Sequence, residues 1–398
     1  MFILALIALM FVGDFVWLFR CERWLRGAGH RWVRGIGLFT VAQIAGLVFV
    51  IVFRPLVNRL APAIATPLLA CVYLWHFLFI LPMMLLWVPA LLAKLVARIA
   101  SGAKRAPASA RTPEMSRRDF IRIAGCAAPA VCTLGVTGFA LAQIQHFRIR
   151  KMEVPIPNLP SALEGLTIAH VTDLHVGHFT HGSILDEIVE ATNSLRADLV
   201  LSTGDLINFD LKDLPAGLSV ITRLRAAHGV FMCEGNHDLF ENADEFRRRT
   251  RAAGVRLLVN ENAVQSIRGT PVQMLGLPWG SGTGHPHAEE NHGENAIAKS
   301  MHRLLQQKQD GAFPIVLAHH PHAFDFAEDI PLTLAGHTHG GQLMVTGELG
   351  CGPMIYRYWS GIYRQAARTL VVANGVGNWF PLRTAAPAEI IHLTLRRA

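Results

Sequence analysis

Long uncharged runs dominate the first third of the chain. Three runs, over 36–53, 60–93 and 123–147, contain no Asp, Glu, Lys or Arg. Each is close to or longer than the roughly 20 residues that an α-helix needs to cross a bilayer. A fourth apolar run, over 2–19, carries a single charge at Asp14. Because an exposed carboxylate is costly in hydrocarbon, we expect Asp14 to face other helices or to lie near a helix end.

The pattern changes beyond residue 165, where short apolar runs end abruptly in polar clusters. A helix is predicted over 183–196, with Ile184 and Ile188 on one side and Asp186 and Glu187 largely opposite. Five other runs are apolar on both faces, as in strands that are covered on each side. This alternation predicts an α/β domain with buried strands over 166–172, 197–203, 230–234, 313–318 and 332–335.

Composition and charge separate the two parts of the chain. Of 398 residues, 51% are hydrophobic and 17% are charged, which excludes a disordered chain. The net charge of +8 is uneven: residues 1–145 hold 15 Lys and Arg against 4 Asp and Glu, and the remainder holds 22 against 25. The C-terminal part therefore offers no general cationic surface, and no nucleic-acid partner is expected. The six cysteines show no disulfide or zinc spacing.

Basic residues in the connections between the apolar runs predict the membrane topology. Five arginines fill the first connection, two lie near the second, and seven Lys and Arg crowd the third. By the positive-inside rule, the first and third connections are cytoplasmic and everything after the fourth span is exported. We expect a multi-pass protein of the cell (inner) membrane with its C-terminal domain on the periplasmic or extracytoplasmic side. The expected division is 1–100, transmembrane helices (about three spans); 101–118, a cytoplasmic linker; 119–145, a fourth span or signal anchor; and 146–398, the α/β domain.

A short motif just before the fourth run bears on export. Ser116 to Arg122, Ser-Arg-Arg-Asp-Phe-Ile-Arg, resembles the twin-arginine signal, which implies export of folded, often cofactor-loaded cargo. The alternative is a pair of arginines that only obey the positive-inside rule. Ala140-Leu141-Ala142 has the small-x-small pattern of a signal-peptidase site. Retention as an anchor is favoured over cleavage, because three upstream spans serve little purpose if the domain is cut free.

Chemistry-bearing residues follow each of the five predicted strands. Ligands in open α/β sheets gather at the carboxyl ends of strands. Taken singly, these clusters are typical of N-caps and turns. Taken together they offer carboxylates, an amide and imidazoles, which are enough ligands for two divalent ions. The clusters are Asp173-Leu174-His175, Gly204-Asp205, Gly235-Asn236-His237-Asp238, His319-His320-Pro321 and Gly336-His337-Thr338-His339-Gly340-Gly341-Gln342.

The order and spacing of these clusters resemble the calcineurin-like metallophosphoesterase superfamily, whose pattern runs D-x-H, GD, GNH, H and G-H-x-H. The resemblance extends from about residue 165 to the C-terminus and implies a four-layer αββα sandwich behind the helical membrane region. The chain also resembles the exported, membrane-associated bacterial branch of that superfamily, in GHTHGGQ at 336–342 and in the segments 358–363 and 375–383.

The resemblance also implies roles for individual residues. Asp205 would bridge two metal ions, and His237 would face the substrate as a catalytic acid or phosphoryl contact. Family members often have GD-x-x-D where this chain has Asn208, so Asp210 and Asp238 are open alternatives for supporting His237. His319 is favoured over His320, since the family's ligand stands two residues before the proline. One ion would be bound by Asp173, His175 and His339, and the other by Asn236, His319 and His337.

Oxygen and imidazole ligands without thiolate suit Mn, Fe or Zn, and the sequence does not choose among them. Such a pair of ions can share a water and activate it for in-line attack on phosphorus. We therefore expect a membrane-anchored dinuclear-metal phosphoesterase, a phosphodiesterase or phosphatase that acts through a metal-bridged hydroxide. Its substrate would be a phosphoester, in particular a lipid or cell-envelope one. The alternative is a noncatalytic membrane sensor or scaffold with a metal-filled domain of the same fold.

Overall fold

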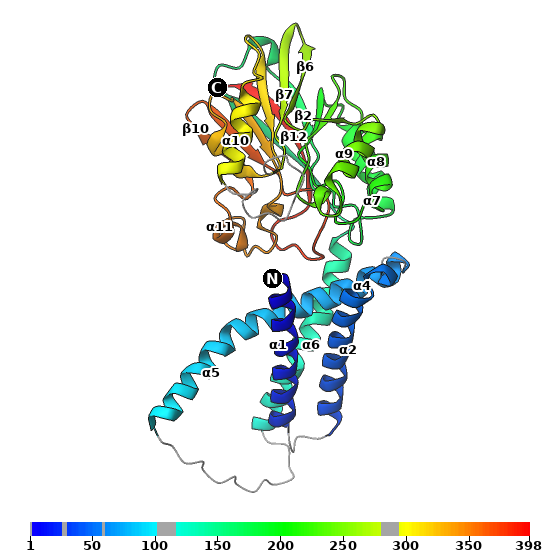
Figure 1. Ribbon diagram of the computed structural model, residues 1–398, viewed down its shortest axis with the longest axis vertical. Coiled ribbons are helices and arrows are strands. Elements are labelled where there is room, and N and C mark those ends of the chain that lie inside the picture. The colour runs from blue at the N-terminus through cyan, green and yellow to red at the C-terminus, as the bar shows by residue number, and fades with distance from the viewer. Residues whose placement is uncertain (1, 26–29, 58–59, 102–116, 280–293) are drawn as a thin grey trace. The chain divides into compact units, whose positions relative to one another are not determined.

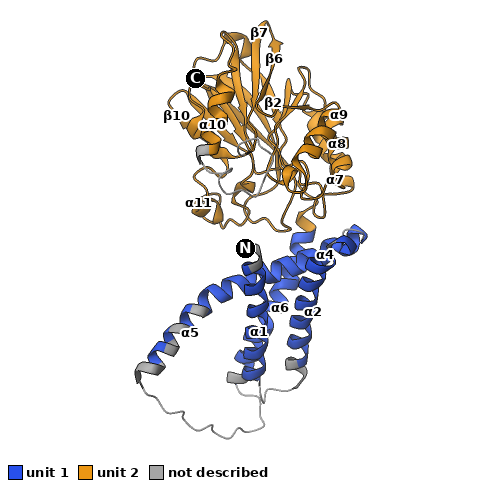
Figure 2. Ribbon diagram, in the orientation of Figure 1, with its two compact units in different colours: residues 1–141 blue, residues 142–398 orange. Residues whose placement is uncertain are grey.

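The structure is a computed structural model that describes residues 2–25, 30–57, 60–101, 117–279 and 294–398. The chain forms two compact units, and Figure 2 shows them in separate colours. We call residues 1–141 the helical unit and residues 142–398 the α/β unit. Most of the predicted linker over 101–118 lies outside the described residues, as does Ser116 of the twin-arginine-like motif.

The described elements of the helical unit are all helices (Figure 1). Among the described residues, three helical stretches are long and apolar enough to cross a membrane, namely Arg34–Val52, Pro62–Trp87 and Phe120–Gln143. The fourth expected span, over 2–19, falls within α1 and stays a prediction. The helices are α1 (Phe2–Leu25), α2 (His30–Val52), α3 (Arg54–Val57), α4 (Pro62–Leu74), the π-helix η1 (Trp75–Ile80), α5 (Leu81–Ser101) and α6 (Arg117–Gln143).

Asp14 is buried inside the helical unit. The indole Nε1–H of Trp75 donates to Asp14 Oδ1 at 2.8 Å, and His76 Nε2 lies 3.0 Å from Asp14 Oδ2. Both partners belong to η1, and π-helical turns are rare and often mark positions under a special constraint. The carboxylate therefore faces other helices, as expected from the cost of exposing it to lipid.

Two six-stranded sheets form the centre of the α/β unit. The first sheet has the order β1-β12-β2-β3-β4-β5, and the second has the order β10-β11-β9-β8-β7-β6. Strands β2, β3 and β4 are parallel, as are β7, β8 and β9, so their carboxyl ends lie at one edge of each sheet. The strands are β1 (Arg148–Ile156), β2 (Thr167–His170), β3 (Leu199–Ser202), β4 (Val230–Met232), β5 (Arg256–Leu257), β6 (Glu261–Ile267), β7 (Thr270–Gly276), β8 (Phe313–Leu317), β9 (Leu332–Ala335), β10 (Gly361–Gln365), β11 (Arg368–Val372) and β12 (Glu389–Arg397).

The two sheets pack face to face with helices on both outer faces (Figure 1). Between the sheets, Leu201 and Phe231 of the first sheet share a buried cluster with Met274 and Ile315 of the second. Helices α7 (Ser183–Ser194), α8 (Leu214–Arg223) and α9 (Ala243–Ala252) cover the first sheet, and α10 (Glu294–Leu305) covers the second. The predicted αββα sandwich is thus confirmed.

All five predicted strands are present, four of them slightly shorter than expected and β9 with the predicted bounds, and the predicted helix over 183–196 corresponds to α7. Hydrophobic pattern did not reveal β1, β12 or the hairpins β6–β7 and β10–β11. Strand β1 has mixed polar and apolar positions with exposed residues over most of its length, so its sequence does not resemble a buried strand. These elements extend the sheets without adding to the ligand-bearing edge.

Candidate metal centre

Strained backbone marks the loops at the carboxyl ends of the strands. Five of the seven predicted ligands have positive φ: Asp173 (53°), His175 (46°), Asp205 (55°), His337 (73°) and His339 (50°). This conformation is uncommon for residues other than glycine and costs of order 1–3 kcal/mol each. It persists only where the surroundings fix it, which here turns short loops so that their side chains point to one place.

Motif glycines allow the carboxylates to lie directly on neighbouring backbone. A Cβ atom added to Gly336 would collide with Asp173 Oδ2, and one added to Gly235 would collide with Asp205 Oδ1. Each glycine directly precedes a predicted ligand, His337 or Asn236. Gly336 and Gly235 are therefore required by close packing against the carboxylates of Asp173 and Asp205, respectively.

The first group of predicted ligands consists of Asp173, His175 and His339. Nε2 of His175 lies 2.9 Å from Nε2 of His339, and the Asp173 Oδ1 atom lies 3.5 Å from His339 Nε2 and 3.9 Å from His175 Nε2. All three side chains are buried. Their ligand atoms lie within 4.8 Å of one another, as required for a shared cation.

The second group consists of Asn236, His319 and His337. Asn236 Oδ1 lies 3.1 Å from both His319 Nε2 and His337 Nδ1, and these two nitrogens are 3.2 Å apart. Asp205 joins the two groups, because its Oδ2 atom lies 3.1 Å from His319 Nε2 and 3.4 Å from His175 Nε2. The arrangement gives two adjoining sets of donors with one carboxylate shared between them.

Burial governs the electrostatics of this centre. It lowers the pKa of His175 and His337 well below the usual value, which favours the neutral imidazole that can bind a cation. It raises the pKa of Asp173 to about 6. Burial would also lower the pKa of His319, but the nearby Asp205 carboxylate outweighs it and raises that pKa to about 9. The carboxylates therefore attract positive charge, which is what a cation site requires.

Neighbouring groups fix the orientation of the imidazoles. His319 Nδ1–H donates to the Thr203 carbonyl at 2.7 Å, which directs Nε2 toward Asp205. The buried Arg383 donates from Nη2 to His339 Nδ1 at 2.7 Å, leaving Nε2 as the atom that faces the centre. Such contacts behind the ligands orient them and tune their affinity. The donor set thus fits divalent cations of the Mn, Fe or Zn type, with no thiolate among the predicted ligands.

His237 lies beside the ligand groups, and hydrogen bonds hold both its ring and its backbone. Its Nδ1–H donates to the Asn208 carbonyl at 2.6 Å, and its backbone N–H donates to Asp205 Oδ1 at 2.8 Å. The rings of Phe209 and Phe240 pack against the imidazole at centroid distances of 5.0 and 4.7 Å. Nε2 is therefore the nitrogen left for substrate, although His237 also groups with His175 and Asp205 as a possible ligand.

Asp238, one of the acids considered as support for His237, serves a different purpose. Its buried carboxylate accepts backbone N–H groups that hold the loop carrying Asp205, and burial raises its pKa to about 8. The backbone carbonyl of Asn208 orients the His237 ring, and the side-chain type at Asn208 is irrelevant to that contact. The donors to Asp238 are the N–H groups of Asp205, Leu206, Ile207 and Gly235, at 2.8–3.1 Å.

His320 does not join either ligand group. Its Nδ1 atom accepts the N–H of His322 at 3.2 Å, and burial lowers the pKa of His320 to about 3. The indole of Trp279 packs beside the centre, 5.5 Å from the His319 ring, 5.8 Å from the His320 ring and 5.2 Å from the His337 ring. The geometry thus favours His319 as the ligand. Sequence reasoning gave no role to Trp279, since no motif contains it.

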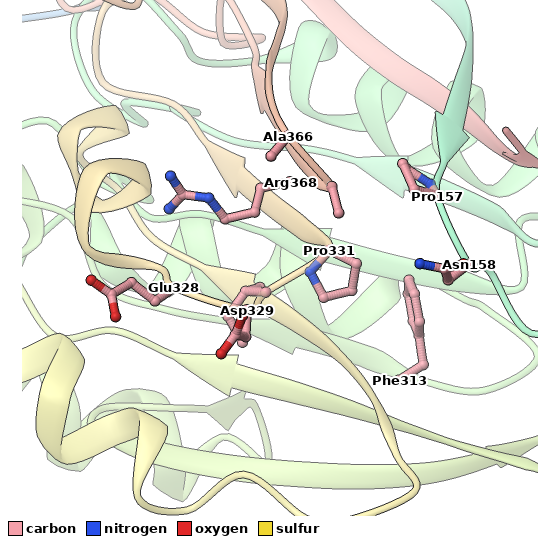
Figure 3. A pocket seen from close by; sticks show the side chains of 10 residues that line it. Pro157, Asn158, Phe313, Glu328, Asp329, Pro331, Ala366 and Arg368 are labelled. Atoms are coloured by element: carbon pink, nitrogen blue, oxygen red, sulfur yellow. The ribbon is translucent and has the colours of Figure 1, made fainter.

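A cavity of about 550 Å³ lies away from this centre (Figure 3). It is lined by Phe313, Pro331 and Arg368, which stand at the starts of β8, β9 and β11, together with Glu328 and Asp329. The predicted ligands stand at the opposite ends of these strands, so this cavity belongs to the other edge of the sheet.

Comparisons with known proteins place these motifs in a family. Residues 166–341 match the family model of the calcineurin-like phosphoesterases. The chain is 30% identical over 257 residues to an uncharacterized metallophosphoesterase of Campylobacter jejuni, with 62% of this chain and 63% of that one covered. It is 27% identical over 272 residues to a transmembrane protein with a metallophosphoesterase domain of Danio rerio, covering 63% and 58%.

A third relative is a phosphodiesterase of Escherichia coli strain K12, 28% identical over 238 residues, with 57% of this chain and 81% of that one covered. The aligned part thus spans less than two thirds of the Campylobacter and zebrafish relatives. The match over 166–341 contains every predicted ligand, so this part of the chain is similar to the calcineurin-like phosphoesterase family.

Proposed function

We propose that this chain is a membrane-anchored phosphoesterase that binds two divalent cations and hydrolyses phosphomonoesters or phosphodiesters. The observation that carries the proposal is the position of Asp205, whose Oδ2 atom lies within 3.4 Å of a histidine from each ligand group. A carboxylate shared in this way is suited to bridging two cations. The relative named as a phosphodiesterase favours diesters as the first substrates to test.

Residues of this chain would divide the work between binding and proton transfer. One cation would be held by Asp173, His175 and His339. The other would be held by Asn236, His319 and His337, and Asp205 would lie between the two groups. When bound, two such cations supply a hydroxide from water at neutral pH and neutralise charge on phosphoryl oxygens.

His237 would contact the phosphoryl group or protonate the departing alcohol through Nε2. Its Nδ1–H bond to the Asn208 carbonyl fixes the ring for that task. The rings of Phe209 and Phe240 shield one side of it from water.

The location that we propose is the cell (inner) membrane, with the α/β unit exported. Three helices that are apolar enough to cross a membrane support the anchoring, and the distribution of basic residues supports the orientation. The twin-arginine-like motif fits export of a domain that folds around its metals. Tethering raises the effective concentration of the site for lipid or cell-envelope phosphoesters. A reporter fused after Arg150 that is active only in the cytoplasm would refute the orientation.

The second candidate function is a noncatalytic sensor or scaffold that uses the metal-filled domain to bind phosphorylated ligands. The presence of a complete ligand set together with an oriented His237 argues for catalysis, because binding alone does not need a positioned acid. Metal bound stoichiometrically without turnover would favour the scaffold.

The decisive experiment uses the full chain purified in detergent and supplied with Mn, Fe or Zn. We expect turnover of a chromogenic diester or monoester, and loss of that turnover in Asp205→Asn. Asp198→Asn is the matched control, because the Asp198 carboxylate accepts the N–H of Thr167 at the start of β2 and lies outside both ligand groups. Full activity in Asp205→Asn would contradict the proposed function.

A further inference from the structure

Exposed apolar side chains of the α/β unit gather in one region. Among the described residues of this unit, five of the six large apolar side chains that are exposed come from the segment 343–355, which ends in α11, and from the loop between β11 and β12. Their exposed fractions run from 37% for Trp379 to 83% for Met354. Large contiguous apolar surfaces are unusual on soluble domains and mark interaction sites. We call this set the apolar rim: Val345, Leu349, Met354, Ile355 and Trp379.

The apolar rim borders the candidate metal centre. The ring of Trp379 lies 6.3 Å from that of His339 and 6.4 Å from that of His237, measured between centroids. Tyr356, which directly follows Ile355, lies 6.1 Å from the ring of His337. A molecule that covers the rim is therefore in reach of the phosphoester site.

The first residues of the α/β unit are hydrogen-bonded to the same loops. Gln143 is the final residue of α6; its Nε2 donates to the Arg383 carbonyl at 2.7 Å, and its Oε1 accepts the Arg383 N–H at 2.8 Å. The next residue, Thr384, accepts the Met344 N–H at 2.9 Å and returns an Oγ1–H bond to the Met344 carbonyl at 2.7 Å. Met344 adjoins Val345 of the rim.

The short connection between α6 and β1 favours the bilayer surface as the partner of the apolar rim. Only a few residues separate the end of α6 at Gln143 from the start of β1 at Arg148. The first strand of the α/β unit therefore follows the candidate membrane span almost directly in the chain. Within the α/β unit, the chain enters at the same end as α11 (Cys351–Ile355), which carries Met354 and Ile355 (Figure 2). Side chains such as Trp, Met and Ile gain from leaving water for the boundary between lipid headgroups and acyl chains.

We propose that the apolar rim inserts into the surface of the bilayer and that the metal centre takes its phosphoester from a lipid headgroup. This inference rests on the proposed function for its chemistry, but the insertion itself can be measured without activity. The bilayer would present a headgroup phosphate beside Trp379, next to the ring of His237.

The first test measures insertion in the full chain, reconstituted in phosphatidylcholine nanodiscs. A fluorescent amino acid is placed at Met354, and quenching by lipids brominated on their acyl chains is recorded. The control position is Lys308, which is exposed and follows α10 at the edge of the sheet away from the metal ligands. We expect several-fold stronger quenching at 354 than at 308. Equal quenching at the two positions overturns the insertion, whether or not the protein is active.

The second test measures substrate choice with Met354→Glu combined with Ile355→Glu. Because charged side chains are costly in a bilayer, we expect hydrolysis of phosphatidic acid or phosphatidylglycerol in nanodiscs to fall by about tenfold or more. Hydrolysis of water-soluble glycerol phosphate and of a chromogenic diester should change by less than about twofold, since both side chains are exposed and neither belongs to the ligand groups. Gln306→Glu with Lys308→Glu is the control pair on an exposed surface.

The outcomes separate the two proposals. Equal losses on lipid and soluble substrates would overturn the docking role of the rim. Turnover of soluble phosphoesters alone by the unmodified chain would overturn the lipid headgroup as substrate. Failure of the unmodified, metal-loaded chain on every substrate would overturn the proposed function, while the quenching measurement still decides insertion.

Discussion

Replacing His237 with alanine separates the proposed acid from the metal centre. The substitution removes the imidazole and its 2.6 Å bond to the Asn208 carbonyl, but it keeps the backbone N–H that donates to Asp205 Oδ1 at 2.8 Å. An unsatisfied buried carbonyl costs about 1–3 kcal/mol, which a folded domain of this size tolerates. The ligand groups should therefore stay in place while the acid is lost.

The size of the effect follows from the role of the imidazole. General acid catalysis contributes typically about 10²–10⁴-fold, which corresponds to roughly 3–5 kcal/mol of the activation barrier. The loss should depend on the departing alcohol. A nitrophenolate leaves with little need of a proton, whereas an alkyl alcohol needs one, so His237→Ala should affect alkyl esters far more.

The assay compares kcat for an alkyl phosphodiester and a nitrophenyl diester in both proteins, with metal content measured in parallel. His302→Ala, a change at an exposed histidine of α10, controls for loss of a histidine elsewhere. Equal losses on both substrates would refute the assignment of His237 as the acid and favour its contact with the phosphoryl group. Loss of bound metal together with activity would identify His237 as a ligand.

Three further predictions concern the site, its pH dependence and the helical unit. Gly336→Ala should impair metal binding, measured by elemental analysis, because the added Cβ collides with Asp173 Oδ2, whereas Gly347→Ala, which has open space, should not. Burial raises the pKa of Asp213 from 3.8 to about 6, so the folded state holds a proton that the unfolded state releases, and stability falls as pH rises through this window. Asp213→Asn should therefore raise the Tm at pH 7.5 and leave it unchanged near pH 4. Asp14→Ala should lower the Tm of the full chain in detergent, since the two side chains of η1 that hydrogen-bond to it lose a buried partner, at about 1–3 kcal/mol each.

Sequence reasoning predicted most of the ligand-bearing edge. The five strands next to the site are short, apolar and followed at once by Asp, Asn or His, so pattern and chemistry coincide there. The sandwich itself was implied by the resemblance to the calcineurin-like superfamily, and the two sheets confirm it. Asp14 could also be placed, because a single carboxylate in an apolar helix has few alternatives to burial.

The remaining features depend on contacts between distant segments. Arg383 lies 44 residues from His339 and yet fixes its ring, and no local pattern announces such a pairing. The carbonyl that orients His237 is backbone, so the identity of Asn208 carries no signal for it. Asp238 is one of the two acids that the sequence offers as support for His237 in place of Asn208, but its carboxylate points to the backbone of the Asp205 loop. The apolar rim emerges only when exposure is known for each side chain.

The most direct measurement of the central claim is the number of metal ions bound per chain by the unmodified protein and by Asp205→Asn. Elemental analysis after equilibration with Mn, Fe or Zn and removal of free metal gives this number. The shared position of Asp205 predicts two ions per chain in the unmodified protein and a clear loss in the variant, with Asp198→Asn unchanged. A single ion per chain would contradict the dinuclear centre, and two ions held equally well without the Asp205 carboxylate would contradict its bridging role.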